Sequence, residues 1–252
     1  MLTNQDDRVI LYTTKGSGRT AGVRKGQTIM EITQEKLDEM IQKHELWLDF
    51  HEGECADFTG MDLRGGNFTG ASLHKANFKN ADLRGAIMIS AMFLEANFIG
   101  ANLEGANLER SDFNDVDMRN AILENANCYR ANFEHSRMDD VNLKGANLKQ
   151  SCLQGVNLSN ANLAGANLEE SLLRDARLNF ADLQGANLHR ADLQGADLPR
   201  GFYQAIFGGD RFCITYDRNS KQYITWNEAM INIQGAEIRA FKEMLKALGV
   251  IK

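Results

Sequence analysis

The sequence predicts a mainly β solenoid, and three observations lead to this class. A five-residue repeat runs without insertion or deletion from residue 56 to residue 200, which makes 29 consecutive units in a chain of 252 residues. The composition, 43% apolar and 25% charged, is typical of a soluble globular protein. A single proline is present, whereas long irregular loops usually contain several. A regular architecture must therefore account for most of the chain.

The five positions of each repeat unit differ in the residues that they contain. The central residue is Leu 18 times, Phe 7 times, Met 3 times and Cys once, and the residue two before it is Ala 20 times, Ser 4 times and Val 3 times. Residues two apart in an extended segment point the same way, so these two positions face inward and the residue between them, Asn or Asp in 21 units, faces outward. The last residue is Gly 11 times, as a tight corner requires.

A period of five does not fit the 3.6 residues of an α-helical turn. The chain is therefore expected to coil as short extended sides around an apolar axis, each coil about 4.8 Å from the next. Units such as Ala101–Gly105 and Ala161–Gly165 resemble the pentapeptide-repeat family, with its A(D/N)LXX motif. The resemblance implies a right-handed quadrilateral β-helix with four units per coil, and a column of leucines at intervals of twenty, from Leu63 to Leu183, is compatible with four sides.

The repeats divide the chain into three regions, 1–55, 56–200 and 201–252. Residues 8–14 and 28–32 are expected to form a small hairpin, and Thr33 is expected to cap a helix that plugs the first coil. The apolar face of that helix comprises Leu37, Met40, Ile41, Trp47 and Leu48.

The third region is expected to hold a second hairpin, between residues 211–216 and 222–226, and an amphipathic helix over 236–248. The apolar face of this last helix comprises Ile238, Phe241, Met244, Leu245 and Leu248. Two interpretations stay open for it: it caps the last coil, or it forms a homodimer by burying identical faces.

The sequence contains no motif for catalysis, for a cofactor or for a metal. Its five histidines are scattered, with those of the repeats expected on the solvated surface, and its four cysteines form no C-x-x-C pair, so we expect reduced thiols and a protein that is not an enzyme. A net charge of −6 argues against direct nucleic-acid binding. A basic, glycine-rich segment over 15–26 could contact phosphate, but a simple hairpin loop is the favoured interpretation. The polar N-terminus and the absence of a long apolar stretch predict a cytoplasmic protein without membrane contact.

Apolar residues at outward positions are the most informative departure from the repeat. Five of them cluster in three successive units, and we call them the apolar patch: Ile87, Ile89, Met92, Leu94 and Ile99. Such a cluster is either a binding site for a protein partner or a surface that the flanking segments of the same chain cover. A second, weaker set contains Cys152, Leu172 and Phe180.

Two functions are compatible with these patterns. The favoured one is a rigid protein–protein interaction module whose partner the sequence does not identify. The alternative comes from the family resemblance: its quinolone-resistance branch consists of dimeric DNA mimics that bind DNA gyrase and topoisomerase IV. Mimicry needs dense negative columns, whereas the repeats hold 19 acidic and 14 basic residues.

Overall fold

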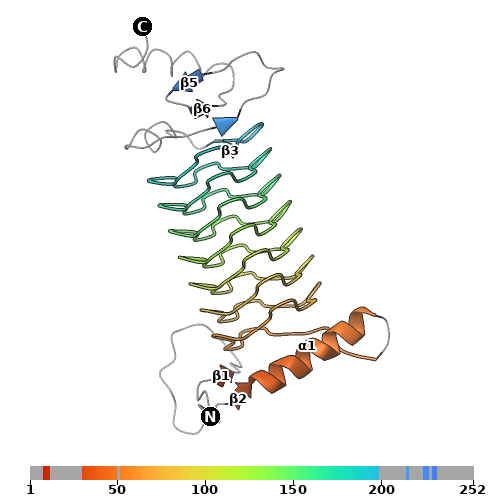
Figure 1. The fold of residues 1–252 in the computed structure, drawn as a ribbon. Helices are drawn as coiled ribbons and strands as arrows, with labels where there is room; N and C mark the ends of the chain where they lie inside the picture. The colour runs from red at the N-terminus through yellow and green to blue at the C-terminus, as the bar shows by residue number, and fades with distance from the viewer. Residues whose placement is uncertain are drawn as a thin grey trace, which may run out of the picture.

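A computed structural model describes residues 8–11, 30–49, 52–198, 214–215, 224–226 and 229–231. Stacked coils of the repeat region form a rod, and helix α1 lies across its N-terminal end (Figure 1). In chain order, the elements are β1 (Arg8–Leu11), β2 (Met30–Thr33), α1 (Gln34–Leu48), β3 (Ala191–Asp192), β4 (Ile214–Thr215), β5 (Ile224–Trp226) and β6 (Ala229–Ile231).

The repeats stack with a period of twenty residues. Parallel bridges join outward positions twenty residues apart, beginning with Asp57 to Asn77 and ending with Arg177 to Asp197. Four units therefore make one coil, as the quadrilateral prediction requires; we number the coils from residue 56, so that the first covers 56–75 and the second 76–95. Each side is one bridge wide because every unit has only three extended residues before its two-residue corner. Among the described repeats, β3 is the one stretch that forms a regular strand.

Every corner of the rod is a tight turn of the same kind. The amide of Ala106 donates to the carbonyl of Leu103 at 3.0 Å, which closes one such turn. The last residue of the unit has a positive φ at all 28 corners from residue 60 to residue 195, while the residue before it does not, and this combination defines a type II turn. Glycine adopts this conformation without steric cost and Asn tolerates it, which explains their frequency at this position.

The axis of the rod is filled by the central residues. Phe58, Phe78 and Phe98 stack in one column, with ring centroids 4.7 and 4.5 Å apart. The column of leucines lies on the next side, and Leu103 and Leu143 are both 0% exposed. The burial of these side chains confirms that the central position faces inward.

Helix α1 covers the exposed edge of the first coil. The Thr33 hydroxyl accepts a hydrogen bond from the amide of Lys36 at 3.3 Å, so the predicted N-cap is confirmed. Leu37 is fully buried, and Met40 and Ile41 pack against the core of the rod. Trp47 and Leu48, at the C-terminal end of the expected face, are half-buried like Met40 and Ile41 but are not among the residues that pack against the core.

The buried face of α1 also contains His44, which the expected apolar face did not include. His44 is two turns after Leu37 and is 0% exposed. Its Nδ1 accepts from the amide of Ala56 at 2.9 Å, while its Nε2 has no partner among the described residues. His74 also differs from the expected solvated surface residue, because its Nε2 is buried and unpartnered there.

Side chains of α1 replace the hydrogen bonds that a preceding coil would make. The Gln34 carboxamide accepts from the amide of Asn67 and donates to the carbonyl of the same residue, both at 3.0 Å. Glu45 Oε1 accepts from the amide of Ser72 at 3.3 Å. Because an unpaired strand edge invites association, this replacement ends the stack in an ordered way.

The short strands of the flanks pair partly as predicted. β1 and β2 are antiparallel, with Val9 opposite Ile32, as the N-terminal hairpin requires. The predicted C-terminal hairpin is wrong in its pairing. β4 runs parallel to β3, with Ala191 opposite Ile214, and β5 pairs with β6. The unpaired edge of the last coil, at β3, forms backbone hydrogen bonds with β4. The composition of the local turn does not predict this pairing.

Candidate functional site

The apolar patch lies mostly on the second coil, directly above the edge that α1 covers. Ile87 is bridged to Asn67 in the coil below, and Met92 is bridged to Ser72. Both lower residues contact α1 through Gln34 and Glu45. Two adjacent sides of the rod therefore present apolar side chains one coil above the helix.

Exposure differs among the members of the patch. Ile87 is 39% exposed and Met92 is 42% exposed, while Ile89, Leu94 and Ile99 are half-buried. Helix α1 hydrogen-bonds to the first coil and leaves Ile87 and Met92 accessible. Ile99 belongs to the third coil, on the side that directly follows the one with Met92 and Leu94.

The patch also lacks a hydrogen bond that most outward positions make. In a typical unit the outward side chain accepts from the amide two residues later, as when Asn107 Oδ1 accepts from Glu109 at 3.1 Å. Ile87 and Met92 cannot accept, so the amides of Ile89 and Leu94 have no protein acceptor in the described part of the chain. Apolar side chains thus lie beside open backbone donors.

Above Ile87 the same column is polar and continuous. The carboxamide of each asparagine donates to the one a coil below, at distances of 3.0 to 3.4 Å, from Asn187 down to Asn107. Ile87 occupies the next position down, where a further asparagine would extend this ladder. Ile87 therefore occupies a position at which an asparagine would add hydrogen bonds to the ladder.

Many charged residues of the described rod are paired with each other. Lys144 lies 3.3 Å from Glu124, and Lys149 lies 3.0 Å from Glu169, in each case one coil apart. Arg84 lies 2.6 Å from Asp82 on the same side. Because cations interrupt the acidic columns, the described repeats present a surface of mixed sign.

The described residues offer no cluster suited to metal or redox chemistry. No group of three or more His, Cys, Asp or Glu side chains is placed to hold a metal ion in the described part. Cys55, Cys128 and Cys152 are free thiols there, and burial raises the pKa of Cys128 to about 12. None of the described helices is both long and apolar enough to cross a membrane.

Cys152 and Leu172 of the weaker apolar set lie on the same side of the rod as Met92, three and four coils further along. Leu172 is 46% exposed and Phe180 is 75% exposed, both far along the rod. Several other predictions lie outside the described residues: the basic segment 15–26, Cys213, and the C-terminal helix with its apolar face of Ile238, Phe241, Met244, Leu245 and Leu248. They stay predictions.

A stack of four-sided coils with type II corners defines the class of protein as a β-helical solenoid. Residues 67–148 match the family described as "Pentapeptide repeat region", and residues 161–199 match "Pentapeptide repeats (8 copies)". The chain belongs to the pentapeptide-repeat family, whose structures are right-handed β-helices.

Solved structures of other family members are similar. A trypsin-treated form of QnrB1, a plasmid-mediated fluoroquinolone resistance protein, is 25% identical over 56% of this chain and 71% of its own, with a TM-score of 0.51. A pentapeptide repeat protein from the thylakoid lumen of Arabidopsis thaliana is 33% identical over 38% of this chain and 67% of its own, with a TM-score of 0.38. Among curated proteins, none matches this sequence.

Proposed function

We propose that this protein is a non-enzymatic interaction module that presents a rigid surface to a protein partner. The observation that carries the proposal is the exposure of Ile87 and Met92, at 39% and 42%, on a rod whose outward positions are mostly polar. Exposed apolar side chains in a cluster are typical of binding surfaces. A rod fixed by ladder bonds on every side loses little conformational freedom on binding, which favours affinity.

The test replaces Ile87 and Met92 with Asn, the residue that most outward positions carry. Full-length wild type and the double variant are immobilised, exposed to lysate of the native organism, and compared by quantitative mass spectrometry. The expected result is loss of a partner from the double variant with no fall in melting temperature. Ile122→Asn, at an outward residue that is 37% exposed in another part of the rod, is the matched control. Equal retention by all three proteins would refute the role of the patch.

Binding to DNA gyrase or topoisomerase IV by DNA mimicry is the second candidate. The similarity to QnrB1 favours it. The mixed charge of the rod disfavours it, because pairs such as Lys144 with Glu124 interrupt any column of phosphate-like charge. We therefore expect no inhibition of gyrase supercoiling at micromolar protein. Clear inhibition or protection would place this candidate first.

A homodimer in the cytoplasm is the assembly that we propose for the full chain. Its basis is the apolar face of the predicted C-terminal helix, since identical faces related by a two-fold axis bury each other. Light scattering at tens of micromolar measures the mass. A dimer that Phe241→Glu converts into a folded monomer is expected, whereas a monomeric wild type would leave the helix as a cap of the last coil.

A further inference from the structure

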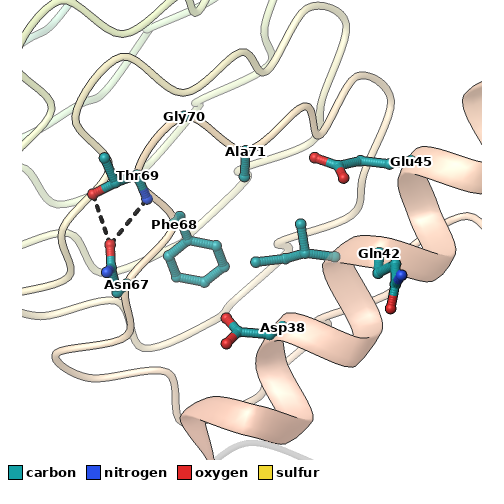
Figure 2. A pocket seen from close by; sticks show the side chains of 9 residues that line it. Asp38, Gln42, Glu45, Asn67, Phe68, Thr69, Gly70 and Ala71 are labelled. Carbon is teal, nitrogen blue, oxygen red and sulfur yellow. Dashed lines mark hydrogen bonds between the residues drawn. The ribbon is translucent and has the colours of Figure 1, made fainter.

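A hollow of about 240 Å³ lies between α1 and the first coil. Its walls are residues of α1 and of the side that contains Phe68, and Figure 2 shows the Phe68 ring facing the helix. Ile41 and Ala71 complete the apolar part of the lining. Pockets for small ligands usually measure roughly 300–1,000 Å³, so this one suits an inserted side chain better than a cofactor.

Two carboxylates flank the hollow, and none of the described residues that line it is a cation. Asp38 and Glu45 both project from α1, on either side of the apolar lining (Figure 2). Each uses one oxygen within the protein: Asp38 Oδ1 accepts from Gln34 at 2.7 Å, and Glu45 Oε1 accepts from Ser72 at 3.3 Å. The second oxygen of each carboxylate has no partner among the described residues.

The spacing of these groups specifies the conformation of the occupant. Asp38 and Glu45 are seven residues apart, which is about 10.5 Å along a helix. Two cations on one face of a partner helix have the same separation when they are also seven residues apart, with an aliphatic residue between them at the third or fourth position. In an extended strand, residues about 10 Å apart are three positions apart and point to opposite faces.

We propose that this hollow binds an amphipathic basic helix of a protein partner, with the pattern cation, aliphatic, cation at positions i, i+3 or i+4, and i+7. The aliphatic side chain enters the hollow against Ile41 and Phe68, and the cations contact Asp38 and Glu45. Ile87 lies one coil above the lining residue Asn67 and extends the apolar contact. This inference deepens the interaction function proposed above and rests on it.

The test selects helices from a defined library on the full-length chain. The library is displayed on phage. It consists of eighteen-residue, alanine-rich helices that are randomised at positions i, i+3, i+4 and i+7. Lys or Arg at i and i+7 with Leu, Ile or Met between them is the expected selection. The best peptide is then labelled with fluorescein, and its affinity is measured by anisotropy at 0.15 M salt.

The decisive variant is Asp38→Asn combined with Glu45→Gln. It removes both charges but leaves carboxamide oxygens that still accept from Gln34 and Ser72, so α1 stays attached. Because each exposed ion pair contributes little, loss of the two should weaken binding by about twofold to thirtyfold, which corresponds to about 0.4–2 kcal/mol. Glu52→Gln with Glu54→Gln makes the same charge change at exposed residues outside the hollow, and should change affinity less than about twofold.

Three outcomes would overturn the inference. The selection yields no basic helix; the selected peptide binds the Asp38→Asn, Glu45→Gln variant as tightly as wild type; or the free chain self-associates and this variant does not, which would make a second copy the occupant. The lysate experiment with Ile87 and Met92 is independent of these. If the lysate experiment loses a partner but the phage selection yields no helix, the interaction function is supported and only this binding mode is refuted.

Discussion

Removal of the Leu143 side chain should destabilise the rod far more than removal of an outward side chain. Leu143 is 0% exposed, and so are Leu123 in the coil below it and Leu163 in the coil above it. The backbone is held by ladder bonds, such as the one from the Leu143 amide to the Asn162 carbonyl at 2.7 Å, so the walls cannot collapse into the hole. Leu→Ala substitutions in such cores cost about 2–5 kcal/mol, and we expect Leu143→Ala to lie in the upper half of this range.

Thermal unfolding of the full chain, followed by circular dichroism, measures the effect. A cost of about 3.5–5 kcal/mol corresponds to a fall in melting temperature of about 7–20 °C for a protein of this size. Gln154→Ala is the control, because Gln154 faces outward and is only half-buried; surface changes of this kind cost less than about 0.5 kcal/mol. Similar shifts for the two variants would refute the assignment of inward and outward positions.

Three further predictions concern single residues. Ile87→Asn should raise the melting temperature by a few degrees, because it adds hydrogen bonds of about 1 kcal/mol each to the asparagine ladder; calorimetry that finds a lower value would contradict this. Burial lowers the pKa of His44, so its contribution to stability is complete above about pH 6.5 and is lost as the pH falls, when a protonated ring can no longer accept from the Ala56 amide; melts at pH 7.5 and 5.5 should differ less in His44→Gln than in wild type. Cys128, with a pKa raised to about 12, should resist iodoacetamide at pH 8 while exposed Cys55 is alkylated; mass spectrometry that finds equal labelling would be evidence against the packed core.

The repeat made the rod predictable because the interactions that define it are local. Whether a residue faces inward depends on its position in a five-residue unit, so Leu103 and Leu143 could be placed in the core from spacing alone. The corner residues and the N-cap at Thr33 follow from the backbone preferences of single residues. The apolar patch was visible in the sequence for the same reason, since it is a departure from a strict pattern.

Other features depend on which segments meet in space. Gln34 pairs with the backbone of Asn67, 33 residues away, and no local pattern indicates that a glutamine will take the place of a missing coil. His44 looked like one of five scattered histidines until the fold placed it against the amide of Ala56. The C-terminal hairpin was wrong because β4 met a free ladder at β3.

The sequence by itself thus determined the repeating unit, the facing of each residue and the class of fold, because five-residue spacing sets all three. Tertiary structure alone decided what covers the N-terminal end of the rod, how β4 pairs with β3, and where Asp38 and Glu45 lie relative to Phe68. These depend on contacts between segments distant in the chain, whose pairing is settled by the competition of all available partners for the same surface rather than by the preferences of any one segment.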